Sequence, residues 1–211
     1  MVKDGDGFTL GGISIGLAMN TVDYYTQKEF GAEYETKISR EELLAEGKKM
    51  ADKIVQRLRE TEGVGDIPIV IGIFEQSTKD NLAGGVYISE TISQDGATTL
   101  QDWKTINQKK LIFPTSGEES TELSSFENFK SEIENFFPNL SGVTAEALYK
   151  DDQIVNMKVA INTQFYGESE IIAFTQNVAE KASSYLLPNI PIEITIKSVN
   201  GTEAFLSRES G

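Results

Sequence analysis

The sequence IPIVIGI at residues 67–73 decides the fold, because every second residue in it is isoleucine. A period of two places alternate side chains on opposite faces of a β-strand, so one face of this strand is apolar. Val70 and Gly72 leave the other face uncharged as well, which predicts a strand in the middle of a sheet. The pattern returns as IPIEITI at residues 190–196. In both copies the proline stands at the strand start, where a missing N–H donor is tolerated.

The segments around these two strands also recur, in the same order along the chain. Ordered matches of this kind are typical of an internal duplication, and shorter spacings in the second copy indicate that the first copy has longer loops. The matching pairs are LAMNT at 17–21 with VAINT at 159–163, Tyr24 with Tyr166, ADK at 51–53 with AEK at 179–181, and VYIS at 86–89 with AFLS at 204–207.

A helix is predicted between the first two strands of each copy. SREE at residues 39–42 is a capping box, in which the serine and the second glutamate each accept a free backbone N–H. Its apolar stripe is expected at Leu43, Gly47, Met50, Ile54 and Leu58. The second helix is expected from about Ser169 to Leu187, with Ile171, Thr175, Val178, Ala182 and Leu186 on its apolar face. The repeated unit is therefore β-α-β-β.

The region between the copies is polar, and residues 117–122 form an acidic stretch that we expect to be a loop. Phe126, Phe129, Ile133 and Phe136 then indicate a short amphipathic helix that Pro138 ends, and Asp151-Asp152 is typical of a hairpin turn. The predicted fold class is α+β: two similar β-α-β-β units with antiparallel or mixed sheets backed by helices. We expect a first unit at 1–95, a polar acidic connection at 96–122, and a helix, hairpin and second unit at 123–211, together one compact two-lobed domain.

Composition excludes several classes of function. The 211 residues contain 19 Lys and Arg against 33 Asp and Glu, a net charge of −14, and no His or Cys. Nucleophilic centres that need histidine or cysteine, the common zinc sites and disulfides are thereby excluded. The negative charge disfavours a nucleic-acid partner. We predict no cofactor, no bound metal and no catalytic residue, and no apolar run approaches the ~20 residues of a membrane helix.

Three short motifs fall below the threshold for a site. The glycines at 5, 7, 11 and 12 do not match a phosphate-binding loop, because Leu10 occupies the place of the third glycine. Asp4 and Asp6 resemble the start of a calcium loop, but Phe8 breaks the pattern. Glu29, Glu33 and Glu35, beside Phe30 and Tyr34 in the longest extra loop of the first half, leave carboxylate-dependent hydrolysis open as an alternative.

Two polar clusters and one tryptophan are the candidate binding residues. Asn20, Thr21 and Tyr24 recur as Asn162, Thr163 and Tyr166, each time at the end of the first strand of a unit. They either line a groove or bond the nearby backbone to turn the chain. Trp103, the only tryptophan, either contacts a partner or anchors the long inter-unit segment to the core.

The strings DGFTLGGISIGLAMN at 6–20, DYY at 23–25 and GAEYE at 31–35 resemble the CamS family, the sex-pheromone-precursor lipoproteins of Gram-positive bacteria. The resemblance covers essentially the whole chain, as the C-terminal portion of the family's mature protein. It implies export, a lipid anchor on a cysteine and a pheromone peptide cut from the signal sequence, and this chain includes neither that cysteine nor the signal. It implies no catalytic residue.

These observations favour a non-catalytic, extracytoplasmic module that binds a peptide, a wall component or a protein partner, and that meets the membrane only through its lipid anchor. The alternatives are a carboxylate-dependent hydrolase of cell-wall glycan and a structural spacer. A buried carboxylate paired with a second one in a cleft would favour the hydrolase.

Overall fold

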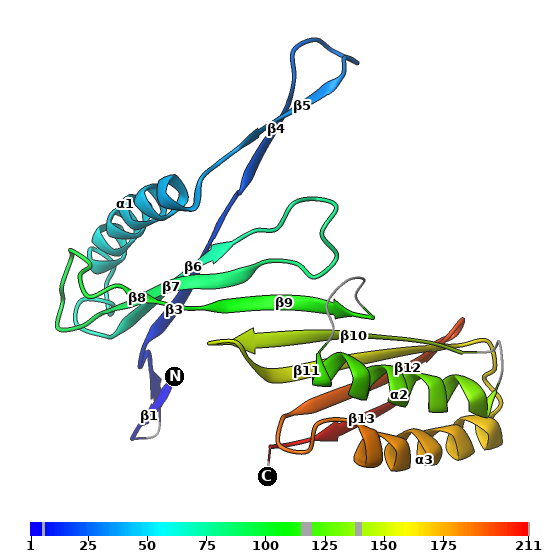
Figure 1. Ribbon diagram of the computed structural model, residues 1–211. Coiled ribbons are helices and arrows are strands. Elements are labelled where there is room, and N and C mark those ends of the chain that lie inside the picture. The colour runs from blue at the N-terminus through cyan, green and yellow to red at the C-terminus, as the bar shows by residue number, and fades with distance from the viewer. Residues whose placement is uncertain (6, 115–119, 138–140, 211) are drawn as a thin grey trace. The chain divides into compact units, whose positions relative to one another are not determined.

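The computed structural model of the protein describes residues 1–211 except 6, 115–119, 138–140 and 211 (Figure 1). The chain divides into two compact units, Met1–Gln108 (unit 1) and Lys109–Gly211 (unit 2). Each unit contains a sheet that mixes parallel and antiparallel pairs and packs against helices, which confirms the α+β prediction. Part of the expected acidic loop, residues 117–119, lies outside the described residues.

Unit 1 is built on a four-stranded sheet of order β3-β6-β7-β8. Its strands are β3 (Ile13–Met19), β6 (Ile69–Glu75), β7 (Val86–Ser93) and β8 (Lys104–Thr105). As predicted from IPIVIGI, β6 is central, parallel to β3 and antiparallel to β7. A short antiparallel pair, β1 (Val2–Asp4) and β2 (Gly7–Thr9), precedes the sheet.

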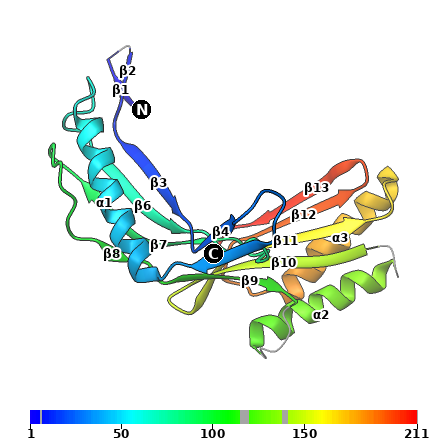
Figure 2. The same ribbon diagram turned by 90° about the horizontal axis from the view of Figure 1, so that it is seen from above.

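The helix of unit 1 is α1 (Arg40–Arg59), and Ser39 and Glu42 cap it with the predicted reciprocal bonds. It runs along one face of the sheet (Figure 2). Its buried positions are Leu43, Gly47, Ala51 and Val55, a stripe of four-residue spacing. The predicted stripe was wrong at Met50, which is 49% exposed. Gly47 packs closely on β6, since a Cβ at this position would lie 3.1 Å from the Ile73 side chain.

A hairpin interrupts the predicted β-α-β-β order of unit 1. Residues that we expected to form a loop instead pair as β4 (Val22–Thr26) and β5 (Glu33–Lys37), a separate two-stranded antiparallel sheet. Polar and acidic side chains at alternate positions hide the strand pattern in the sequence, because neither face of this hairpin is apolar. Val22 is its one buried residue, at 7% exposure.

Unit 2 has a five-stranded sheet of order β13-β12-β11-β10-β9. Helices α2 (Thr121–Phe136) and α3 (Glu168–Tyr185) pack together and cover one face of it (Figure 2). The strands are β9 (Gln108–Phe113), β10 (Ser141–Lys150), β11 (Gln153–Thr163), β12 (Ile192–Ser198) and β13 (Gly201–Arg208). Asp151 and Asp152 form the predicted hairpin turn, both with positive φ (51° and 62°).

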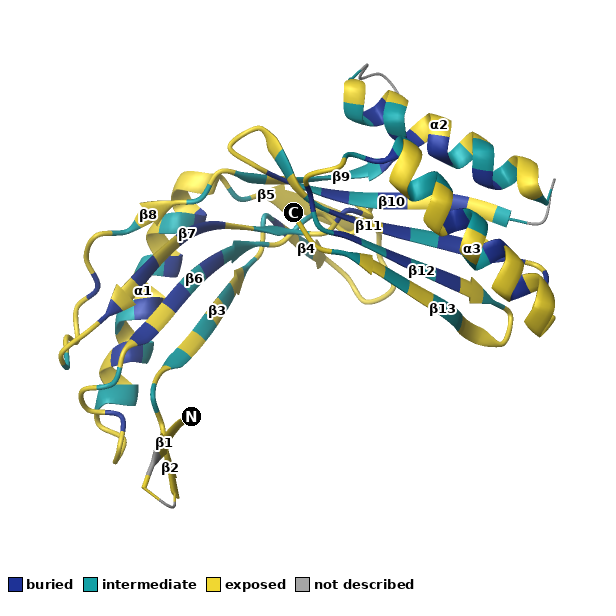
Figure 3. Cartoon of the chain, turned by 90° about the horizontal axis from the view of Figure 1, so that it is seen from below, coloured by how far each residue is buried: buried dark blue, intermediate teal, exposed yellow. Residues whose placement is uncertain are grey.

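The core of unit 2 is one cluster of buried side chains from these elements. Phe126, Phe129 and Ile133 are fully buried as predicted, whereas Phe136 is 38% exposed. The alternation of buried positions with intermediate or exposed ones is visible along β11 and β12 in Figure 3. The opposite face of the sheet is charged, since Lys110 lies 3.0 Å from Glu146 and Lys158 lies 3.4 Å from Glu193.

The segment expected as a polar connection, 96–122, contributes to both sheets through β8 and β9. Leu100 is buried at 7% exposure, and its N–H donates to the Asp52 carboxylate at 2.9 Å. Periodicity did not reveal these strands, because both residues of β8 are exposed and only Leu111 and Phe113 of the edge strand β9 reach the core.

The two units share one connectivity: strand, helix, parallel strand, antiparallel strand. The backbone also repeats a detail, since Pro68 O accepts from Ile13 N and Pro191 O accepts from Met157 N. By this hydrogen bond Ile13 and Met157 occupy equivalent positions in the two units. The sequence matching instead aligns Ile13 with Val155, two residues earlier. The topology is therefore compatible with a duplication, which stays a prediction. The match of residues 17–21 with 159–163 and the match of residues 67–73 with 190–196 cannot both hold at one register.

Candidate functional site

A hollow of about 420 Å³ opens in unit 1 where β3 passes into β4 and where β6 ends. This volume falls within the roughly 300–1,000 Å³ of small-ligand sites. Two strand ends and the loop that follows β6 supply its walls. The lining residues are Asn20, Thr21, Val22, Tyr24, Phe74, Gln76, Ser77, Lys79 and Gly85.

Hydrogen bonds to backbone groups hold the walls of the hollow together where β3, β4 and the end of β6 meet. The Thr21 hydroxyl donates to Gln76 O at 2.9 Å, and Gln76 N donates to Met19 O at 2.9 Å. Ile38 N donates to Thr21 O at 2.8 Å, which closes the base of the hairpin. The Thr21 side chain therefore positions the wall.

Lys79 and Tyr24 form the outer wall. The Lys79 ammonium lies 4.6 Å from the centroid of the Tyr24 ring and pairs with the Glu33 carboxylate. Its backbone N–H is 3.4 Å from the Tyr24 hydroxyl oxygen. The hydrogen bond to Glu33 raises the pKa of Lys79 above its ordinary value of 10.5. The ammonium is therefore charged at neutral pH, and Glu33 balances its charge.

The remaining lining groups are neutral. The side-chain amides of Asn20 and Gln76 have no hydrogen-bond partner among the described residues, so they are available to a ligand. Phe74 and Tyr24 supply aromatic surface. Gly85 lets the backbone before β7 pack against the end of β6, because a Cβ there would lie 2.1 Å from Glu75 O. This combination of free amides and rings suits an uncharged ligand that carries amide or hydroxyl groups.

The structure brings Asn20, Thr21 and Tyr24 together in this hollow. Their predicted counterparts Asn162, Thr163 and Tyr166 belong to unit 2 and are not among its lining residues. Thr163 is buried, and its hydroxyl donates to Phe165 O at 2.8 Å and to Lys197 O at 3.3 Å, the backbone-bonding alternative. Asn162 is exposed, and Tyr166 is 59% exposed.

Trp103 packs against the α1-facing core of unit 1, beside the clusters of Ile71 and of Ile73. The Lys48 ammonium lies 5.4 Å from the ring centroid. This partly buried placement corresponds to the anchor alternative. Sequence reasoning missed five lining residues, because they belong to no motif and lie together only where the hairpin contacts the loop after β6. These residues are Phe74, Gln76, Ser77, Lys79 and Gly85.

The carboxylates do not form an acid–base pair within the described part of the chain. None of the described Asp or Glu residues is buried, and the lowered pKa of Glu42 has its cause in the capping box, where the Ser39 hydroxyl bonds its carboxylate. Glu75 instead receives a two-pronged bond from Arg40, at 2.9 and 2.5 Å. The hydrolase alternative thus has no supporting observation here.

Across the described residues, no three Asp or Glu side chains gather in a way that could hold a metal ion. Asp6 of the calcium-like pattern lies outside the described residues, and so does the side chain of Asp4. Of the three described helices, none is both long and apolar enough to cross a membrane.

Comparison with known proteins gives consistent matches. The family model described as CamS sex pheromone cAM373 precursor matches residues 1–211. A crystal structure of a sex pheromone precursor from Lactobacillus salivarius subsp. salivarius UCC118 is 40% identical, with a TM-score of 0.83 over 93% of this chain and 58% of that one. The C-terminal domain of the sex pheromone staph-cAM373 precursor from Staphylococcus aureus is 30% identical, with a TM-score of 0.85 over 94% and 61%.

A further crystal structure, of the sex pheromone staph-cAM373 precursor, is 26% identical and has a TM-score of 0.51 over 98% of this chain and 69% of that one. No curated protein matches. The chain thus spans about three fifths of the first two similar structures. The match over residues 1–211, together with 40% identity to a solved precursor, shows that this chain belongs to the CamS sex pheromone cAM373 precursor family.

Proposed function

We propose that the chain is a non-catalytic, extracytoplasmic domain of a membrane-anchored lipoprotein and that unit 1 binds an uncharged wall fragment or peptide in the hollow beside Tyr24. The 211 residues contain no cysteine, so the proposed lipid attachment is not to a residue of this sequence. Membership of a pheromone-precursor family supports this proposal and names no reaction.

One observation carries the binding role. Asn20 and Gln76 both line the hollow together with the aromatic residues Tyr24 and Phe74, and their side-chain amides have no partner in the described structure. Amide pairs recognise peptide groups and the N-acetyl groups of wall sugars through reciprocal N–H and C=O bonds. The balanced charge of Lys79 and Glu33 favours neutral ligands over acidic ones.

A ligand titration tests the proposal. We would add muropeptides, chitooligosaccharides and neutral peptides to the ¹⁵N-labelled chain and follow amide shifts together with the melting temperature. A ligand at about 100 times its Kd should stabilise the protein by about 2.7 kcal/mol and shift the Thr21, Tyr24 and Gln76 amides. Gln76→Ala should weaken that binding about tenfold, the equivalent of one hydrogen bond of about 1.4 kcal/mol.

Asn128→Ala is the matched control, because Asn128 is an exposed amide of α2 in unit 2. It should leave the affinity unchanged. Silence of the whole panel, or equal binding by the Gln76→Ala chain, would contradict the proposal, and silence would favour the spacer role.

A further inference from the structure

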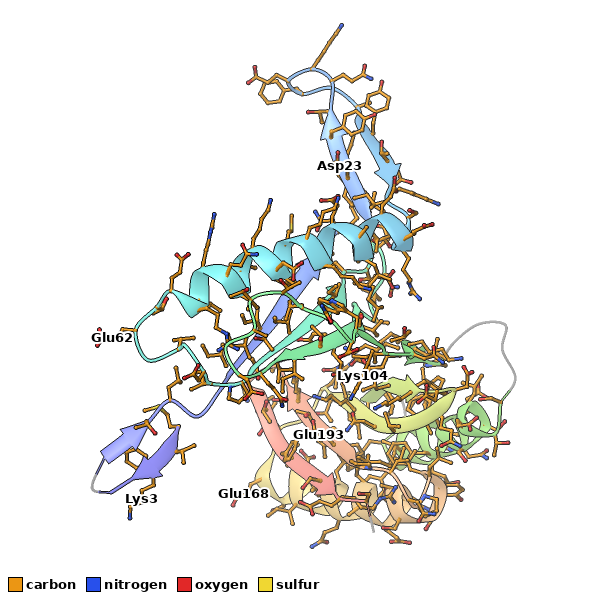
Figure 4. The ribbon with its side chains drawn as sticks, turned by 90° about the vertical axis from the view of Figure 1, so that its left-hand side faces the viewer. Lys3, Asp23, Glu62, Lys104, Glu168 and Glu193 are labelled. Atoms are coloured by element: carbon orange, nitrogen blue, oxygen red, sulfur yellow. The ribbon has the colours of Figure 1, made fainter. Side chains whose placement is uncertain are left out.

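The β4–β5 hairpin carries three aromatic side chains that the described chain leaves in solvent. Phe30 at its tip is 99% exposed, and Tyr25 and Tyr34 on its strands are 41% and 45% exposed. The two strands pair with each other and, among the described strands, with no other, so both hairpin edges have free backbone groups. Figure 4 shows the hairpin, with Asp23 labelled, projecting beyond the end of α1.

One face of the hairpin is already held by unit 1. Val22 is buried, and Tyr24 and Glu33 contact Lys79 of the loop after β6. Residues two apart on a strand share a face, so Tyr24 and Tyr25 point to opposite sides. The face that carries Tyr25 is therefore the one that these contacts leave free.

The free face combines aromatic rings with negative charge. The register places Tyr25 opposite Tyr34 and Asp23 opposite Thr36, and these four residues share the face. The two tyrosine rings stack with centroids 5.8 Å apart and an interplanar angle of 25°. Asp23 makes no ion pair within the described structure, and the hairpin lysines lie elsewhere, Lys37 on the other face and Lys28 in the tip.

Both the backbone conformation and the solvent exposure of Phe30 are energetically unfavourable in the isolated chain. Its φ of 59° is the left-handed conformation, which a bulky side chain adopts at a cost of about 1–2 kcal/mol. Its ring is also almost wholly in water. Strain of this kind is concentrated where a side chain is held for contact with something else.

We propose that Asp23, Tyr25, Tyr34 and Phe30 form a docking surface for an extended basic segment of a protein partner. Arginine or lysine side chains of that segment stack on the tyrosine pair and bond the Asp23 carboxylate, and an apolar side chain covers Phe30. Its backbone adds to a free hairpin edge, as in β-strand addition.

Charge selects this occupant. Asp23 lies on the surface, Glu29 is next to Phe30 in the tip, and the whole chain has a net charge of −14. A basic segment is attracted to this surface, whereas an anionic lipid surface repels it. The surface does not include the lining residues of the hollow, so this inference stands independently of the proposed function.

Titration of the full chain with the synthetic peptides (Arg-Val)₄ and (Glu-Val)₄ tests the inference. The arginine peptide should bind, shift the amides of residues 23–36 and lose affinity as salt rises, and the glutamate peptide should not bind. Tyr34→Ser should weaken binding by tenfold or more. Phe30→Gly should weaken it at least threefold without lowering the melting temperature, because glycine accepts the positive φ.

Matched controls separate this surface from the general acidity of the chain. Asp23→Asn should reduce affinity at least threefold, whereas Glu62→Gln, beyond the other end of α1 in Figure 4, removes one exposed charge with little effect. Val199→Ser removes an 82% exposed apolar side chain of unit 2 and should change nothing.

Equal effects of the Asp23 and Glu62 substitutions, or full binding by both the Tyr34→Ser and the Phe30→Gly chain, would overturn the inference. So would the absence of peptide binding together with Phe30-dependent sedimentation of the chain with phosphatidylglycerol vesicles, which would assign the hairpin to a membrane.

Discussion

The stability of unit 1 should depend strongly on Arg59, in the last turn of α1. Its guanidinium donates to Val64 O at 2.8 Å, Ile67 O at 2.7 Å and Ser93 Oγ at 2.5 Å. Further bonds reach Gly65 O at 3.0 Å, Ser93 O at 3.2 Å and Ala97 O at 3.4 Å. One side chain thus joins the end of the helix, the loop before β6 and the end of β7.

Replacing Arg59 by methionine keeps most of the aliphatic stem and removes every one of these bonds. Four of them go to part-buried groups, the carbonyls of Val64 and Ile67 and the carbonyl and hydroxyl of Ser93. At about 1 kcal/mol each, with some recovery by water, the loss should be about 3 kcal/mol of unfolding free energy. With a urea m-value of about 2 kcal/mol/M, the midpoint should fall by about 1.5 M.

Urea unfolding followed by tryptophan fluorescence measures this loss. Trp103 is the only tryptophan and lies in unit 1, so its emission reports that unit. Arg57→Met is the matched control, because Arg57 is in the same helix turn, is exposed, and makes no side-chain bond within the described structure. Its effect should stay within about 0.5 kcal/mol. If the two substitutions shift the midpoint equally, the structural role of Arg59 is wrong.

Three further predictions use the same urea assay. Ser39→Ala removes a bond from each side of the capping box and should lower the stability of unit 1 by about 1 kcal/mol, and a midpoint equal to wild type would contradict the cap geometry. The Ser39 bonds hold the pKa of Glu42 below its ordinary value of 4.5, so Glu42 contributes stability above that pH and loses it as pH falls through the lowered pKa. The midpoint difference between wild type and Glu42→Gln should therefore shrink on acidification below 4.5, and a difference that grows would refute the assignment. Phe129 is fully buried in a cluster drawn from unit 2 alone, so Phe129→Ala should destabilise that unit by about 3–5 kcal/mol in far-UV circular dichroism while the Trp103 transition keeps its midpoint.

Local chemistry alone determined several parts of this protein. Alternating isoleucines made residues 69–75 and 192–198 strands, because only a period of two puts all those side chains on one face. The Ser39–Glu42 box began α1 at the predicted residue, because a cap is satisfied within one turn. Asp151-Asp152 formed a turn, because aspartate tolerates the left-handed conformation.

Tertiary structure decided the rest. The exposed fraction of Met50 and the strands within 96–122 depend on which neighbour packs against them, and a single window of sequence does not contain that neighbour. Asn20, Thr21 and Tyr24 stood out in the sequence, but Phe74, Gln76 and Lys79 line the same hollow only because the hairpin lies beside the loop after β6. Strand register is set by long-range pairing and side-chain contact, so alternation could predict the strands but not their partners. The sequence matching aligned Ile13 with Val155, whereas in the sheets Ile13 pairs with Ile69 and Met157 pairs with Ile192.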